Sequence, residues 1–235
     1  MNLFSGLQRA MKKIGILGIT PAGTVKHFEY VLQIAKDKLG QQNLPDILLS
    51  LENFEVYYKS QQNRAEIWPG LFLTSLKALR EQGAEVISCP ANSIFETLSP
   101  EVLSTAPELI HIADPVIKTI TQNNYRQVLL LGTNFTVNSN IFLSRAKSEE
   151  IQFVTLSTNC QSKVHDLIVN FLIFGDPGDK LTEVADAILK ETAHIDAIIL
   201  GCTELFMLED RLSEHLPVLD SNFLLAGECI ARATS

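Results

Sequence analysis

The chain has 235 residues, of which 46% are hydrophobic and 20% are charged. This size and composition exclude a mainly disordered chain and allow a buried core without disulfides or metals. With 27 acidic and 19 basic residues the formal net charge is −8, and there is no Lys/Arg cluster, which argues against nucleic acid as a partner.

The sequence also indicates in which cellular compartment the protein is expected. No apolar run reaches the length of a membrane span, and the first ten residues lack the continuous apolar stretch of a signal peptide. We therefore expect a cytoplasmic protein with no membrane partner, in which residues 1–12 form an N-terminal extension. In that compartment the cysteines are expected to be reduced thiols, and their usual role is that of a small buried hydrophobe: Cys89, Cys160, Cys202 and Cys229.

Short runs rich in Ile, Val and Leu alternate with stretches of helical periodicity. In chain order the pattern predicts strand 14–18, helix 22–39, strand 46–51, helix 67–82, strand 85–89, helix 114–123, strand 127–131, helix 135–147, strand 152–156, helices 162–174 and 179–193, strand 196–200 and helix 222–233. Continuous apolar strands between helices favour an α/β fold with parallel sheets covered on both faces.

The two halves of the chain resemble each other. The segment at residues 16–20 is followed by a helix, as is the similar segment at residues 130–134, and strand ends recur at residues 86–93 and 198–205. We expect two similar lobes related by pseudo-twofold symmetry, one formed by residues 13–113 plus 219–235 and the other by residues 114–218. Ligands of parallel sheets bind beyond the carboxyl ends of the strands, so the two lobes would enclose one cleft.

Four places in the sequence are candidates for chemistry. The turn at residues 18–24 offers backbone N–H groups to a carboxylate or phosphate, although its glycines do not fit a dinucleotide-binding pattern. Asn92 and Ser93 follow a strand, either as ligand-binding side chains or as turn residues. Cys202 follows a buried strand, either as a thiol acidified by a helix N-terminus or as a buried thiol at a tight turn. His111 is either a carboxylate ligand or, as we favour, a satisfied buried histidine.

Taken in order, these segments resemble the motifs of the cofactor-independent aspartate/glutamate racemases. Residues 13–24 resemble the opening IGxxGGMGPxAT, 48–54 the second-strand LYSxxF, 111–114 match HIxD, and 131–136 resemble LGTxxT. Residues 83–87 lead into the first cysteine motif, PCNTxH, and 200–205 match the second cysteine motif without a change. The resemblance runs from Lys13 to the C-terminus.

The resemblance implies an isomerase that uses two cysteines and neither metal nor organic cofactor. One thiolate removes the Cα proton of an amino acid and the other thiol returns a proton to the opposite face. It further implies a homodimer, an amino acid or dicarboxylic acid as the small-molecule partner, and Cys202 as one catalytic thiol. By the same resemblance the residues that would hold the substrate are Thr20, Asn92, Ser93, Thr133 and Thr203, with Glu204 beside them.

The sequence departs from the family at the first cysteine, because alignment on Pro90 and Asn92 places Ala91 at that position. Alanine cannot carry a proton. Cys89 lies on the same side of the strand but roughly 6–7 Å further back, and Ser93 or a bound water would be a weaker base. Further departures are Phe95 at the histidine position of this motif, Ile19 at a glycine of the first motif, and the lack of a histidine in residues 220–225.

Three functions are compatible with these departures. The first is an amino-acid racemase that uses Cys202 and a non-thiol partner. The second is a one-thiol isomerase or decarboxylase, which some members of the wider superfamily resemble. The third is a protein that binds an amino acid or organic acid without turnover.

Overall fold

The computed structural model describes residues 11–146, 150–177 and 179–235; residues 1–10 of the expected N-terminal extension lie outside them. The predicted α/β class with two parallel sheets is confirmed. The first sheet has the order β2-β1-β3 and the second β5-β4-β6-β7. The strands are β1 (Ile14–Gly18), β2 (Ile47–Leu51), β3 (Val86–Ser88), β4 (Gln127–Leu131), β5 (Gln152–Val154), β6 (Ala197–Leu200) and β7 (Val218–Asp220).

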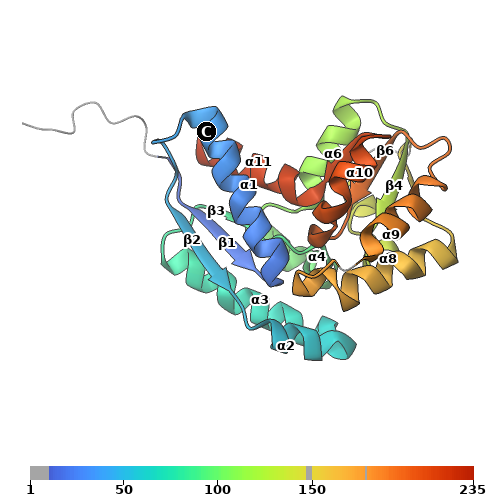
Figure 1. The fold of residues 1–235 in the computed structure, drawn as a ribbon. Helices are drawn as coiled ribbons and strands as arrows, with labels where there is room; N and C mark the ends of the chain where they lie inside the picture. Colours follow the sequence, from blue (N-terminus) through green and yellow to red (C-terminus); the bar gives the residue numbers. More distant parts are fainter. Residues whose placement is uncertain (1–10, 147–149, 178) are drawn as a thin grey trace, which may run out of the picture.

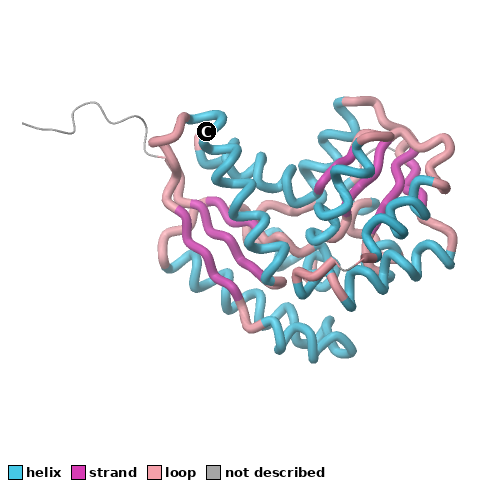
Figure 2. Tube along the Cα trace, viewed as in Figure 1, coloured by secondary structure: helices cyan, strands magenta, loops and turns pink. Residues whose placement is uncertain are grey.

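Helices cover the sheets and fill the space between them (Figure 1). The α-helices are α1 (Pro21–Leu39), α2 (Phe54–Lys59), α3 (Arg64–Glu81), α4 (Asn92–Thr97), α5 (Pro100–Ser104), α6 (Ala113–Gln122), α7 (Asn134–Val137), α8 (Thr158–Asn170), α9 (Lys180–Leu189), α10 (Glu209–Ser213) and α11 (Ser221–Ala233). Short 3-10 helices are η1 (Ser60–Asn63), η2 (Leu143–Arg145), η3 (Leu172–Phe174) and η4 (Thr203–Leu208). Figure 2 shows the two sheets as separate groups of strands on either side of the molecule.

The two sheets share one plan. β1 lies between β2 and β3, as β4 lies between β5 and β6. β7 completes the second sheet beside β6, and in the first sheet the segment around Leu109 runs parallel to β3 through a single bridge to Ile87. That bridge has regular ladder bonds: Ile87 N–H donates to the Glu108 carbonyl and Ile110 N–H to the Ile87 carbonyl, both at 2.8 Å. The internal sequence similarity therefore corresponds to a repeated strand order.

Apolar side chains bury both faces of the second sheet. Along β4, Leu129 and Leu131 belong to one core cluster, whereas Val128 and Leu130 belong to another. This separation follows from the two-residue period of a strand. The first lobe has its own core, to which α11 contributes residues such as Leu225. α11 follows β7 of the second sheet directly but packs mainly against α1, so the chain returns to the first lobe at its end.

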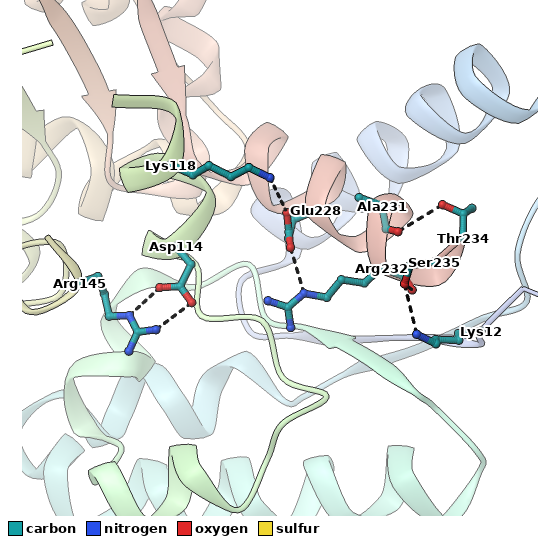
Figure 3. A network of polar contacts seen from close by, with 9 residues as sticks. All are labelled: Lys12, Asp114, Lys118, Arg145, Glu228, Ala231, Arg232, Thr234 and Ser235. Atoms are coloured by element: carbon teal, nitrogen blue, oxygen red, sulfur yellow. Dashed lines mark hydrogen bonds and ion pairs between the residues drawn. The ribbon is translucent and has the colours of Figure 1, made fainter. Parts of the chain in front are cut away.

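Surface ion pairs join α11 to the second lobe. Figure 3 shows Lys118 of α6 reaching Glu228 of α11, with 3.7 Å between the charged atoms. Glu228 also accepts from Arg232 at 3.0 Å, and Arg145 forms a two-bonded pair with Asp114 at 2.6 and 2.9 Å. Exposed pairs of this kind contribute about 0–1 kcal/mol each, so burial of the apolar faces supplies most of the stability.

The predicted helix at residues 135–147 is wrong. Residues 134–137 form the single turn α7, and residues 143–145 form only η2; residue 147 lies outside the described residues. Polar side chains end the helix early, because the amide of Asn138 donates to the Asn134 carbonyl at 2.7 Å and the hydroxyl of Ser139 to the Thr136 carbonyl at 2.8 Å. Such bonds compete with helix propagation.

The helix predicted at residues 67–82 begins earlier, at Arg64, with Pro69 inside it. The structure also contains α2, α4, α5, α10 and β7, which the sequence pattern does not predict. None of the helices in the described ranges is long and apolar enough to cross a membrane.

Candidate active site

A cavity of about 590 Å³ lies beyond the carboxyl ends of the central strands of both sheets, a size within the range of ligand sites. Every residue that the sequence singled out as catalytic or substrate-binding lines it: Thr20, Ala91, Asn92, Ser93, Thr133, Cys202, Thr203 and Glu204. Thr20 follows β1, residues 91–93 follow β3, Thr133 follows β4 and residues 202–204 follow β6. Both lobes thus contribute to one site.

Cys202 is the partly exposed thiol of this cavity. Its Sγ donates a hydrogen bond of 3.0 Å to Oε2 of Glu204, whose side chain is buried. Burial, and then the negative charge of Glu204, raise the pKa of the Cys202 thiol well above its usual value. Backbone N–H groups of Thr203 and Glu204 at the start of η4 lower this pKa, but by less than burial and the Glu204 carboxylate raise it.

Glu204 is fixed by hydroxyl groups from two parts of the chain. Oε1 accepts from the hydroxyl of Thr20, and Oε2 lies 3.2 Å from that of Thr203. The Thr203 hydroxyl also lies 3.2 Å from the Pro90 carbonyl, so its one proton serves one acceptor at a time. No cation is paired with Glu204 among the described residues. The cavity therefore contains a buried carboxylate whose charge the described residues do not balance.

Gly23 allows this arrangement because the first turn of α1 approaches it closely. A Cβ added at Gly23 would lie 2.9 Å from Oε1 of Glu204 and 2.9 Å from Oγ1 of Thr20, and closer still to the Thr203 hydroxyl. No ordinary side chain fits such distances without movement. The glycine of the first motif thus has a packing role directly beneath the site.

Ala91 and Cys89 occupy different environments. Ala91 lines the cavity, whereas Cys89 is fully buried and does not line it. Burial raises the pKa of the Cys89 thiol. Cys89 therefore cannot serve as a proton carrier in the cavity without rearrangement of the loop, as the spacing along the strand predicted.

Asn92 presents an unused acceptor. Its amide nitrogen donates to the Ser221 hydroxyl at 3.2 Å, and that hydroxyl donates to the Leu200 carbonyl at 2.7 Å. Its Oδ1 is buried and has no partner among the described residues. A buried oxygen without a donor is costly, so this atom is suited to accept a hydrogen bond from a ligand.

A buried histidine supports the site from behind. The Nδ1 of His27 lies 2.7 Å from Oδ1 of Asn222, and its Nε2 lies 2.9 Å from the Ser88 hydroxyl. The amide of Asn222 donates to the Gly23 carbonyl at 3.0 Å, which orients its Oδ1 as an acceptor and so places the imidazole proton on Nδ1. Burial lowers the pKa of His27 to about 4, so the ring is neutral at pH 7 and joins α1, β3 and α11.

His111 does not line the cavity. It is buried, its Nδ1 accepts from the Ala113 N–H at 3.3 Å, and its ring contacts Phe95 at 4.6 Å between centroids. The structure agrees with the interpretation of a satisfied buried histidine. Phe95 occupies the position of the family histidine and contributes to this packing.

In the second lobe, Thr133 caps α7 by accepting from the Thr136 N–H at 3.3 Å. Gln161 donates to the Gly132 carbonyl at 2.9 Å and to Asn134 at 3.1 Å, which fixes the neighbouring loop. His165 also lines the cavity, where its Nδ1 accepts from the Asn134 N–H at 3.3 Å.

Sequence reasoning missed a further part of the wall, which α2, η1 and the start of α3 provide. Its members include Phe54, Tyr57, Tyr58, Lys59, Arg64 and Trp68. Phe54 ends the second-strand motif after β2, but the others belong to no motif, and their helical spacing alone is typical of a packed helix. No group of three or more His, Cys, Asp or Glu side chains in the described part of the chain is arranged to hold a metal ion.

Fold and site together define a two-lobed α/β protein with a thiol-bearing ligand cavity between its lobes. A family model described as Asp/Glu/Hydantoin racemase matches residues 16–229, and the chain belongs to this family. It is 24% identical over 225 residues to the broad specificity amino-acid racemase RacX of Bacillus subtilis, covering 93% of this chain and 96% of that protein.

Two solved structures share the fold. One is a putative Asp/Glu racemase from Yersinia pestis, with a TM-score of 0.81 and 24% identity, covering 96% of this chain and all of the other. The second is an aspartate racemase homologue from Pyrococcus horikoshii OT3, with a TM-score of 0.77 and 26% identity over the same shares.

Proposed function

We propose that this protein is a cofactor-independent, racemase-like isomerase that transfers a proton at the Cα of an amino acid through Cys202. The observation that carries the proposal is the partly exposed Cys202 thiol, held 3.0 Å from buried Glu204 in a cavity between the lobes. Thr20, Asn92, Ser93, Thr133 and Thr203 line the same cavity and would hold the substrate.

The protonation states explain how the thiol would work. Burial and the negative charge of Glu204 favour the protonated thiol, which makes Cys202 a proton donor. A substrate ammonium group beside Glu204 would balance the carboxylate and lower the thiol pKa, which favours the thiolate needed to remove a proton. The lack of a described cationic partner for Glu204 thus supports an amino acid as substrate over a simple organic acid.

A carbanion next to a carboxylate needs fixed hydrogen-bond donors and a site from which water is excluded. The Thr133 hydroxyl, which caps α7, would supply such a donor. The hydroxyl protons of Thr20 and Thr203 are directed at Glu204 and the Pro90 carbonyl, and the free atom of Asn92 is Oδ1, which accepts. In this proposal Thr133 donates to the substrate carboxylate and Asn92 Oδ1 accepts from the substrate ammonium group, while Cys202 faces Cα.

A second candidate function is one-sided chemistry, namely isomerisation or decarboxylation with a single thiol. Ala91 favours it, because that residue lines the cavity and carries no proton. The raised pKa of Cys202 suits the same role, since a protonated thiol can quench a carbanion without first acting as a base. In a racemase, Ser93 or a water molecule would have to transfer the proton on the face of Cα opposite to Cys202.

Proton exchange separates these functions. L- and D-aspartate and L- and D-glutamate are incubated with the protein in heavy water, and the Cα proton signal is followed by NMR. Loss from both enantiomers of one acid indicates a racemase, and loss from one enantiomer indicates one-sided transfer. A release of carbon dioxide from a malonate-like acid would identify a decarboxylase.

The matched variants are Cys202→Ala and Cys89→Ala. The first should lower exchange by about 100-fold or more, because it removes the proton carrier. The second removes a buried thiol outside the cavity and should leave exchange in place while lowering stability. Exchange that persists in Cys202→Ala would refute the assignment. Ligand-dependent heat stabilisation without exchange would identify a binder.

The family resemblance further supports a homodimer as the assembled form. Sedimentation velocity at several protein concentrations tests this part of the proposal independently of activity.

A further inference from the structure

Arg64 is held between the two lobes at the cavity wall. Its guanidinium carbon lies 5.1 Å from the ring centroid of Trp68 on the same helix and 4.1 Å from that of Phe135 on α7. All three residues line the cavity. Stacking on aromatic faces fixes the plane of a guanidinium while its edge N–H groups remain available for bonds in that plane.

Those N–H groups are largely unused. Nε of Arg64 donates to the Gln61 carbonyl at 3.0 Å, and no ion pair with a carboxylate is present among the described residues. Lys59 lines the same cavity, but its side chain is 72% exposed and pairs with Glu55. Arg64 is therefore the half-buried cation of this wall whose charge remains available to a ligand.

We propose that Arg64 is the specificity-determining residue of this cavity and binds the distal carboxylate of a dicarboxylic amino acid. This inference rests on the proposed function, in which Cys202 and Glu204 act at Cα. A planar guanidinium fits a carboxylate with two parallel N–H bonds. A neutral side chain in the same place would leave a desolvated cation unpaired, so the wall selects for a second negative charge.

Isothermal titration calorimetry on the full chain tests the proposal by comparing glutamate with glutamine, and aspartate with asparagine, in both enantiomers. These pairs differ in one oxygen and one charge at the distal group. The wild-type protein should bind one acid about tenfold or more tightly than its amide. Arg64→Gln should lower the affinity for that acid by about tenfold and alter the affinity for the amide by less than about twofold. Arg64→Lys should recover part of the loss.

Lys77→Gln is the matched control, because Lys77 is an exposed lysine of the same helix and its loss changes the net charge equally. Thermal unfolding of each variant shows that it is folded. Equal wild-type affinity for acid and amide would overturn the proposal. The proposal would also be overturned if the preference for the acid over its amide persisted in Arg64→Gln, or if Lys59→Gln abolished that preference instead. A wild-type protein that binds neither glutamate nor aspartate would overturn it as well.

The two proposals fail separately. If an acid binds through Arg64 but its Cα proton does not exchange, the proton-transfer function fails while the role of Arg64 stands. If Cα exchange depends on Cys202 but acid and amide bind equally, the function stands and the role of Arg64 fails.

Discussion

Ala91 and Cys202 stand at the same position in the two lobes. Each is the residue directly before the first helical turn that follows an inner strand, β3 for Ala91 and β6 for Cys202, and each has an extended backbone. Their φ and ψ angles are −151° and 103° for Ala91 and −131° and 132° for Cys202. Both line one cavity. The repeated fold thus presents a thiol from one lobe and a methyl group from the other.

This relationship predicts that Ala91→Cys adds a second proton carrier to the cavity. Cysteine is only slightly larger than alanine, and the position already opens to the cavity. If the wild-type protein exchanges the Cα proton of one enantiomer, the variant should exchange both. If the wild type already uses a weaker second base, exchange on the slower enantiomer should rise by about tenfold or more. The measurement is NMR in heavy water with both enantiomers.

Ser93→Cys serves as the comparison for Ala91→Cys, since Ser93 lines the same cavity one helical position further on. A gain in Ser93→Cys with none in Ala91→Cys would show that the second face of the substrate lies against Ser93. The equivalence of Ala91 and Cys202 would then be structural only.

Glu204→Gln should make Cys202 more reactive when no substrate is added. The carboxylate raises the thiol pKa, and glutamine keeps a similar shape without the charge. The pH profile of Cys202 alkylation by iodoacetamide, read by mass spectrometry, should therefore move to lower pH. Glu183→Gln removes an exposed carboxylate and should leave the profile in place. A profile that does not move would mean that burial alone sets the reactivity of Cys202.

Much of the fold was predictable because a parallel strand that is buried on both faces has a continuous run of apolar residues in the sequence. β1 and β4 were predicted with the bounds that the structure gives them. The prediction of a helix at residues 135–147 was wrong because the side chains of Asn138 and Ser139 donate to nearby backbone carbonyls. The periodicity of apolar residues contains no information about such bonds. β7 was missed since it offers only two apolar residues between Pro217 and the helix that Asp220 caps.

The residues of the candidate site likewise fall into a group that the sequence predicted and a group that it did not. Thr20, Thr133 and Cys202 follow strand ends, so the topology alone brings them to one edge of each sheet. Arg64 and Tyr57 reach the cavity from helices that no motif marks. They line the cavity because tertiary packing places residues 54–68 along its wall. That Arg64 forms no ion pair with the described residues is visible only when the neighbouring side chains are in place.

Gly23→Ala should disturb the site more than the fold. The added methyl group would meet Thr20, Thr203 and Glu204, so we expect a loss of about 1–3 kcal/mol in unfolding free energy together with weaker ligand binding. Gly227→Ala is the matched control, because a Cβ at this position of α11 meets no atom within 4 Å. It should be neutral or stabilise by about 0.5–1 kcal/mol. Urea unfolding and calorimetric titration measure the two effects.

His27 should make the protein sensitive to acid. Burial lowers its pKa from 6.5 to about 4, so between these values the unfolded chain binds a proton that the folded chain does not. Stability is therefore complete above pH 6.5 and falls as the pH drops toward 4, by about 3 kcal/mol from this residue alone. Urea unfolding measured at steps from pH 7 to pH 4 checks this.

His27→Gln should be less stable at pH 7, because the bonds to Asn222 and Ser88 are weakened, but its stability should fall less steeply with acid. Two other buried groups also make stability depend on pH, and they do so in both proteins. His111 lowers stability as the pH falls, whereas Asp220, whose pKa burial raises to about 6, raises it. Both effects cancel when the acid curve of the variant is subtracted from that of the wild type. His215→Gln, at an exposed site, should follow the wild type. Parallel acid curves for wild type and His27→Gln would mean that His27 is not held neutral between α1, β3 and α11.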